Sequence, residues 1–402
     1  MEGALHLPDA DTRGLATEVL GVLGRPPQPT AAGQQDAPAP DDADLLRRAV
    51  LTVGGGRAAI QARMGPERAA RALAEGLADK SVPARTAYAR ALAEMGPLAM
   101  PALPALARTL RECRAHIAEG RQRYEWGPLS DHVTFALSRI GEAGVGPLVE
   151  ALDAGGPQEY RDAIARGLGA VQPPSAAGTA ALAAHLRQLT GPHASDAGRS
   201  MAEALRRQGA VAELVAALDG PAAFSAEWVL GQMGEAAVPA LTRAVSSGGP
   251  ALRLGATRTL AGIEIPAGRP ASAALAAVLA DDQSPADLVT AADQAFARQG
   301  GPEGVPALAR AVRGGEPPTS PRAARALGFV CPASDEAVLA LAWGAGQADQ
   351  ATRAQSLDSL RRLGPAAAQA LQRLATATGG GIGAEDRARA REAIDKLAAG
   401  TR

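Results

Sequence analysis

The sequence predicts an all-α fold, built as a right-handed α-solenoid of about ten helix pairs. Only 2% of the 402 residues are aromatic, while the hydrophobic 47% consists mostly of Ala, Leu and Val. Ala and Leu favour helices, whereas strands favour aromatic and β-branched residues. A chain of this length also exceeds the size at which one hydrophobic core usually stops growing. A stack of repeats, each packed only on its neighbours, satisfies both observations.

A short pattern recurs along the chain: a Leu, an aliphatic residue three positions later, and then a Gly. Full copies are Leu92…Met95-Gly96, Leu137…Ile140-Gly141, Leu230…Met233-Gly234 and Leu360…Leu363-Gly364. Two looser copies end in Gln208-Gly209 and Gln299-Gly300, and three copies lack the Gly (Leu168…Val171, Leu260…Ile263, Leu327…Val330). The eight intervals from Leu92 to Leu360 average 33.5 residues. Because Gly tolerates the positive φ that ends a helix, each copy predicts a helix end.

A second apolar run follows each of these turns, most clearly from Gly234 to Val245. Pro239 would lie in the first turn of that helix, where its missing N–H has little consequence. A period near 33 residues fits two helices and two turns, and one such pair cannot bury both apolar stripes alone. Neighbouring pairs are therefore expected to stack.

The combined pattern, Gly-x-x-Ala-Val-Pro-Ala-Leu followed by Arg-x-x-Ala-x-x-x-Leu-x-x-Ile-Gly, resembles the HEAT repeat, especially its phycobilisome-lyase-type subclass. The resemblance covers residues 45–400 in about ten copies. It implies that the second helix of each pair lines a concave groove. It also implies a ladder of Asp–Arg pairs, which would correspond here to Asp79 with Arg85 and to Asp349 with Arg353.

The chain is expected to have three parts. Residues 1–24 form an N-terminal segment with one possible short helix, residues 25–44 a flexible linker rich in Pro and Asp, and residues 45–400 the repeat array. Only two cysteines are present and no secretory signal peptide or membrane-spanning run is visible, so we expect a cytoplasmic protein. The formal charge of −1 gives no overall attraction to nucleic acid, which we do not expect as a partner.

Arginines recur before the repeated Leu in the pattern Arg-x-x-x-x-Arg-x-Leu. The second arginine of this pattern supplies the candidate binding residues Arg90, Arg166 and Arg258, and Arg325 holds the same place before Leu327. A row of arginines along the groove would suit an acidic peptide or a phosphate. The alternative is that they are solvated helix residues that pair within or between repeats.

The longest interval, from Leu92 to Leu137, contains an insertion with Arg121, Arg123, Tyr124 and Trp126. Tyr, Trp and Arg dominate the energetics of protein interfaces, so these four residues are the second group of candidate binding residues. The alternative is that the Trp folds the insertion back onto its own helices.

Catalytic and metal-binding motifs are weak. Cys113, His116 and His132 fall short of the four ligands of a zinc site. The HEAT-like deoxyhypusine hydroxylases hold iron with His-Glu pairs, and no His-Glu dipeptide occurs here. We therefore expect no catalytic residues, no metal and no cofactor.

The leading hypothesis is a non-enzymatic scaffold that binds a protein or peptide in its groove. The alternative implied by the resemblance is an enzyme or chaperone that acts on a pigment-bearing protein, as bilin lyases do.

Overall fold

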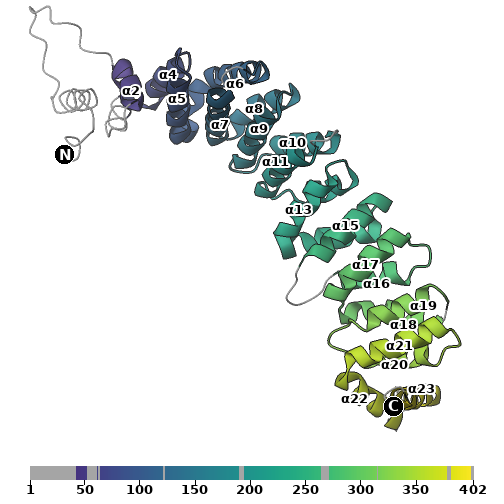
Figure 1. The fold of residues 1–402 in the computed structure, drawn as a ribbon. Helices are drawn as coiled ribbons and strands as arrows, with labels where there is room; N and C mark the ends of the chain where they lie inside the picture. Colours follow the sequence, from purple (N-terminus) through teal and green to yellow (C-terminus); the bar gives the residue numbers. More distant parts are fainter. Residues whose placement is uncertain are drawn as a thin grey trace, which may run out of the picture. The chain divides into compact units, whose positions relative to one another are not determined.

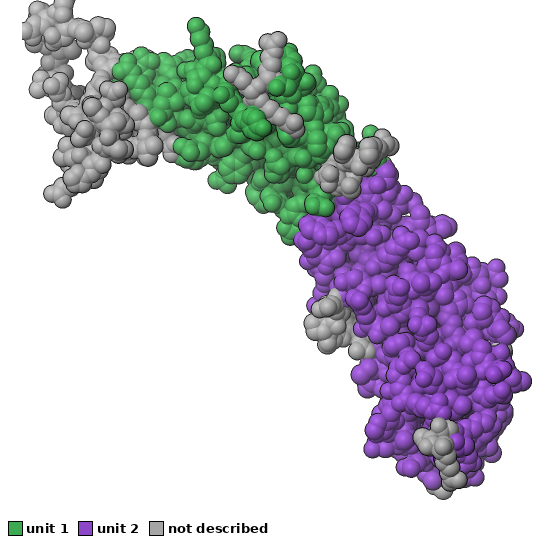
Figure 2. Space-filling view, in the orientation of Figure 1, with its two compact units in different colours: residues 1–210 green, residues 211–402 purple. Residues whose placement is uncertain are grey.

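The computed structural model describes residues 42–51, 61, 64–120, 123–189, 194–263, 271–314, 316–377 and 382–399. The chain forms two compact units, residues 1–210 and residues 211–402 (Figure 2). Within the described ranges all regular structure is helical and no strand occurs, which confirms the predicted all-α class. The segment expected at residues 1–24, and residues 25–41 of the linker expected at 25–44, lie outside these ranges. The first described helix, α2, begins at Asp42, inside the linker expected at residues 25–44.

Unit 1 consists of helix pairs arranged in two layers (Figure 1). One layer holds α5 (Val82–Met95), α7 (Arg123–Ile140), α9 (Gln158–Ala170) and α11 (Ala194–Arg207), each packed on the next. The other holds α4 (Pro66–Gly76), η2 (Gly96–Ala102), α6 (Leu103–Ala118), α8 (Glu142–Asp153) and α10 (Ala176–Gln188). Helix α2 (Asp42–Leu51) packs on α4 and α5.

Unit 2 repeats the two-layer arrangement. One layer holds α13 (Ala223–Met233), α15 (Pro250–Gly262), α17 (Ala286–Gln299), α19 (Thr319–Leu327) and α21 (Gln350–Leu363). The other holds α12 (Val211–Ala216), α14 (Val238–Ser247), α16 (Ser272–Ala280), α18 (Val305–Gly314), α20 (Asp335–Ala345) and α22 (Pro365–Thr376). The short turns η3 (Ala217–Asp219), η4 (Gly234–Ala237) and η5 (Pro302–Gly304) join them, and α23 (Ala384–Ala399) packs on α20 and α22.

The repeated Leu and Gly have the predicted roles, with one exception. Leu92, Leu137, Leu230 and Leu360 are all buried. Positive φ angles occur at the motif glycines Gly96, Gly141, Gly209, Gly234 and Gly364. Gly300 is the exception, because its φ is −61° and the chain leaves α17 in an extended conformation.

Two helices that end without a motif glycine are instead capped from the next repeat. The side chain of Gln208 donates from Nε2 to the carbonyl oxygens of Leu168 (3.0 Å) and Val171 (3.1 Å) at the end of α9. Its Oε1 accepts from the backbone N–H of Ser175 at 2.9 Å. In the same way, Gln299 donates to the carbonyl oxygens of Leu260 and Ile263 at the end of α15. The caps satisfy buried carbonyl groups that a helix end otherwise leaves without partners.

The Asp–Arg ladder implied by the resemblance is wrong for both pairs. Asp79 accepts from the backbone N–H of Ser81 at 2.8 Å, while Arg85 bonds to Glu112 on α6. Asp349 caps α21 by accepting from the N–H of Thr352 at 2.6 Å, and Arg353 donates to the carbonyl of Gln347 at 3.2 Å. Both aspartates precede a helix, where an unpaired backbone N–H lies closer than an arginine side chain.

Candidate functional site

One side chain per repeat forms an exposed row along the first layer of each unit. It lies two residues before the buried Leu of the motif, which is about 200° around the helix and therefore on the opposite face. In unit 1 these positions are Arg90 on α5, Phe135 on α7, Arg166 on α9 and the partly exposed Glu203 on α11; in unit 2 they are Trp228 on α13, Arg258 on α15, Gln294 on α17, Arg325 on α19 and Asp358 on α21. We call these positions the outer row. All four arginines predicted as groove residues belong to it.

Two large aromatic side chains occupy the outer row, and sequence reasoning missed both. Phe135 is 49% exposed and Trp228 is 42% exposed. A third aromatic, Phe224, lies one helical turn before Trp228 on α13 and is 65% exposed. Aligning the repeats on their buried Leu would have placed Phe135 and Trp228 in register with the arginines. The outer row therefore mixes aromatic, cationic and acidic side chains.

Most arginines of the outer row lie beside acids of the preceding helix in their layer. Arg166 forms an ion pair with Asp131 at 2.5 Å, and Arg325 with Asp293 at 2.9 Å. Arg258 lowers the pKa of Glu227, although burial has the larger effect and leaves that pKa raised. Two of these arginines thus pair between repeats, as the alternative interpretation predicted. Arg90 forms no ion pair with another described residue.

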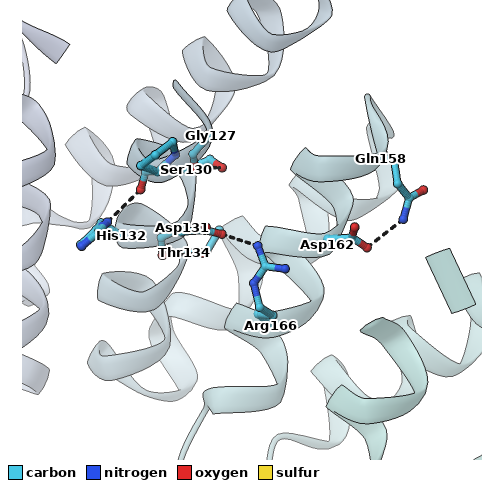
Figure 3. Close-up of polar contacts among 9 residues, drawn as sticks. Gly127, Ser130, Asp131, His132, Thr134, Gln158, Asp162 and Arg166 are labelled. Atoms are coloured by element: carbon cyan, nitrogen blue, oxygen red, sulfur yellow. Dashed lines mark hydrogen bonds and ion pairs between the residues drawn. The ribbon is translucent and has the colours of Figure 1, made fainter. Parts of the chain in front are cut away.

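A cleft of about 580 Å³ opens between α7 and α9, directly beside the outer row. Its lining consists of Tyr124, Gly127, Pro128 and Asp131 from α7, and Glu159, Asp162 and Arg166 from α9. Figure 3 shows Asp131 and Arg166 facing each other across it, with Asp162 one turn before Arg166 on α9. Three carboxylates and one guanidinium give the cleft a net negative charge.

Asp162 is the least solvated of the cleft carboxylates. It is half-buried, and burial raises its pKa above the ordinary value of 3.8 despite hydrogen bonds from Ser200 and Gln158 and the charges of Arg166 and Arg161. Gln158 Nε2 donates to Asp162 Oδ1 at 2.8 Å (Figure 3). An ammonium or guanidinium group placed beside Asp162 would stabilise the negative charge that burial disfavours. The cleft is therefore suited to a basic group, contrary to the acidic ligand that the arginine pattern suggested.

The insertion is the start of helix α7, and its Trp is not a surface anchor. Trp126 is only 5% exposed, its ring stacks on His116 with centroids 3.9 Å apart, and the Arg85 guanidinium lies 5.0 Å from the ring centre. The aromatic ring therefore folds α7 onto α5 and α6, as the second interpretation of the insertion held. Tyr124, in contrast, is 95% exposed. Arg121 and the side chain of Arg123 lie outside what the structure describes.

The three residues considered for zinc do not form a site. Cys113 is buried, and burial raises the pKa of its thiol to about 12. His116 stacks on Trp126, and Nδ1 of His132 is 2.8 Å from the carbonyl oxygen of Pro128. In the part of the chain that is described, no three His, Cys, Asp or Glu side chains are grouped to hold a metal ion. The same part contains no helix long and apolar enough to cross a membrane.

Comparison with known proteins finds no family for this chain and only distant similarity to solved structures. No protein-family model and no curated protein matches the sequence. Similar solved structures include human deoxyhypusine hydroxylase in complex with glycerol (17% identity, 75% of this chain and 98% of that chain, TM-score 0.28). An engineered protein is also similar, with 18% identity over 96% of this chain and 98% of that chain and a TM-score of 0.32. A mutant of Kap121p has 12% identity over 98% of this chain and 52% of that chain, with a TM-score of 0.40. The all-α repeat class of this chain rests on its own helices, described above. At these TM-scores the similarity supports no conclusion about function.

Proposed function

We propose that the chain is a non-enzymatic scaffold that binds a protein or peptide partner on the layer formed by α5, α7 and α9. The observation that carries this proposal is the exposure of Phe135 on the outer row. The chain has ten aromatic residues, and its core is filled largely by Ala and Leu. A single exposed ring is common on protein surfaces, but Phe135 lies beside the cleft lined by Tyr124 and Arg166, and aromatic and arginine side chains grouped together are typical of a binding site.

The outer row and the cleft of unit 1 form one continuous surface. Asp131 and Phe135 are four residues apart on α7, and Asp162 and Arg166 are four residues apart on α9, so each pair shares a helix face. The ion pair between Asp131 and Arg166 joins the two helices at the centre of this surface. Aromatic and arginine side chains contribute most of the energy in protein interfaces, and a negative cleft beside them selects the charge of the partner.

The partner best suited to this surface is an extended or helical segment with an apolar side chain and a nearby Lys or Arg. The apolar group would pack on Phe135. The cation would enter the cleft beside Asp162 and Asp131, where burial raises the pKa of Asp162. Such a partner differs from the acidic peptide expected from the sequence, because Arg166 already pairs with Asp131.

The test is selection of binders from a random-peptide display library against the full chain. We expect enrichment of peptides that combine an aromatic or aliphatic residue with Lys or Arg. Phe135→Ala should weaken the binding of the selected peptides by about tenfold or more, as loss of an interface anchor does. Leu98→Ala is the matched control, since Leu98 is 57% exposed on η2 in the other layer. Equal affinities for the two variants would refute the proposal.

The charge preference has its own test with the same peptides. Asp131→Asn together with Asp162→Asn should weaken the binding of Lys-containing peptides and reduce the dependence of that binding on salt. Replacing the Lys of a selected peptide by norleucine should remove the difference between this variant and the wild type. If acidic peptides are enriched instead, the partner assignment is wrong even if Phe135 proves to be an anchor.

The finer resemblance, to phycobilisome-lyase-type repeats, stays a prediction, as does a cytoplasmic location. An enzyme or chaperone for a pigment-bearing protein would bind a chromophore with acidic groups and an apolar ring. Visible absorbance of the purified protein after incubation with a bilin would test that alternative.

A further inference from the structure

A second, smaller cavity lies in unit 1 between α6 and α8, in the layer that does not carry the outer row. Its volume is about 180 Å³. Small side chains of α6 and α8 form part of its wall, and the chemically active lining consists of Arg111 and Arg114 from α6, Glu150 from α8 and Tyr160 from α9. Cavities that enclose whole small molecules are usually larger, roughly 300–1,000 Å³. This one has room for a single functional group.

Tyr160 forms part of the wall of this cavity and carries an unused polar group. The residue is 0% exposed, and its buried hydroxyl has no hydrogen-bond partner among the described residues. Gly156 allows the ring to lie this close to the chain: a Cβ atom added there would be 3.0 Å from Tyr160 Cδ1 and 3.2 Å from Arg114 Cγ. A buried hydroxyl without a partner is unfavourable, and native proteins normally satisfy such groups.

The hydroxyl of Tyr160 is a hydrogen-bond donor at neutral pH. Burial, and to a lesser extent the nearby Cys113, raise its pKa to about 12, while Arg114 and Arg111 act in the opposite direction. Arg111, Arg114 and Tyr160 all line this one cavity. A phenol and two guanidinium groups together form an arrangement that binds an oxyanion.

The two arginines keep N–H groups available for a ligand. Arg114 uses Nη1 to donate to the carbonyl oxygen of Ala154 at 3.0 Å, which fixes the side chain at the end of α8. Arg111 forms no hydrogen bond or ion pair with any residue that the structure describes. Glu150 adds one negative charge, so the lining carries a net charge of +1.

We propose that this cavity binds a single carboxylate group, held by Arg111, Arg114 and the hydroxyl of Tyr160. A carboxylate carries one negative charge and neutralises the lining. A phosphate monoester carries nearly two charges at neutral pH and would leave an excess beside Glu150. The site is separate from the outer row and does not depend on the proposed scaffold function.

The experiment is a titration of the full chain with ¹³C-labelled acetate, followed by NMR at constant ionic strength set with chloride. We expect saturable binding in the millimolar range, typical of one charged group. Arg111→Gln and Tyr160→Phe should each weaken it by about fivefold or more. Arg108→Gln, on an exposed arginine of the same helix outside the cavity, should stay within about twofold and controls for the general loss of charge.

Tyr160→Phe provides a second measurement that a purely structural role would not give. Without ligand, this variant should be as stable as the wild type or more stable, because it removes an unpartnered hydroxyl. Lower stability would show that the hydroxyl already has a partner, and would overturn the proposal. So would absence of saturable acetate binding, an equal effect of Arg108→Gln, or tighter binding of inorganic phosphate than of acetate.

Two further ligands identify the source of the carboxylate. Acetyl-Ala-Ala-Ala with a free carboxyl terminus represents a peptide end, and its amide lacks the charged group. Tighter binding of the free peptide than of acetate, with no binding of the amide, would identify a chain terminus. Tighter binding of acetate would identify a small carboxylic acid. Binding of the amide as tightly as the free peptide would exclude carboxylate recognition.

Discussion

At the scale of single residues, Trp126 shows how a typical interface residue can be structural. Tyr124 and Trp126 are neighbours in a sequence with few aromatics, and composition alone cannot separate them. The helix separates them: Trp126 points inward to His116 and Arg85, while Tyr124 lies on the surface at the mouth of the cleft. The start of α7 at Arg123, which the sequence pattern did not indicate, determines this outcome.

Trp126→Ala is therefore expected to destabilise unit 1. Loss of a buried aromatic ring typically reduces the free energy of unfolding by about 3–5 kcal/mol. Tyr124→Ala, at a residue that is 95% exposed, should change it by less than about 0.5 kcal/mol. Denaturant unfolding followed by circular dichroism measures both. Comparable stability of the two variants would mean that Trp126 is not part of the packing.

At the scale of helices, the sequence predicted the ends and buried positions but not the contacts between repeats. The motif Leu and most motif glycines behave as expected, because helix periodicity and positive φ are local properties. Contacts between repeats join residues far apart in the chain, such as Arg166 with Asp131 and Gln208 with Leu168. They depend on how helices are staggered, which no local pattern specifies. The exposed aromatics of the outer row were missed for a different reason, since only alignment of the repeats reveals them.

The glutamine caps give a test at this scale. Gln208→Ala would leave the carbonyls of Leu168 and Val171 and the N–H of Ser175 buried without that partner. We expect a loss of about 3 kcal/mol in the free energy of unfolding, since each buried polar group without a partner is costly. Gln294→Ala, on an exposed glutamine of the outer row, is the control and should be near neutral. Equal effects would exclude a capping role.

The effect of the Arg258 charge on Glu227 gives a prediction about pH. Burial raises the pKa of Glu227 above 4.5, so the stability that this group contributes is complete below that pH and is lost as the pH rises through the folded-state value. Arg258→Gln removes the attraction that opposes this shift. The variant should be less stable than the wild type at pH 7, and the difference should shrink below about pH 4.5. Arg90→Gln is the control, and a pH-independent difference for Arg258→Gln would contradict the assignment.

At the scale of the whole molecule, the chain divides into two compact units, residues 1–210 and 211–402. Each unit is a stack in which helices contact mainly their neighbours. The stability of such a stack is close to the sum of the stabilities of its repeats and of the interfaces between neighbouring repeats. A destabilising substitution can therefore affect only the repeats around it.

Leu137→Ala tests this locality. The residue is 0% exposed on α7, and its truncation should reduce local stability by about 2–5 kcal/mol. Hydrogen exchange should then accelerate in α5, α7 and α9, while α19, α20 and α21 keep the protection of the wild type. A uniform loss of protection throughout both units would show that the chain unfolds as one cooperative body.

The glutamine caps also limit how this chain can be rearranged. Helices α9 and α15 end without a motif glycine, and each relies on the helix that follows it in the same layer. A repeat that lacks the motif glycine therefore depends on the next repeat, which carries the capping glutamine. Deleting, duplicating or shuffling one of the two repeats would leave either uncapped carbonyl groups at the helix end or a buried glutamine amide without a hydrogen-bond partner. The smallest exchangeable module at these two places is a pair of repeats, and engineered arrays should be cut between such pairs.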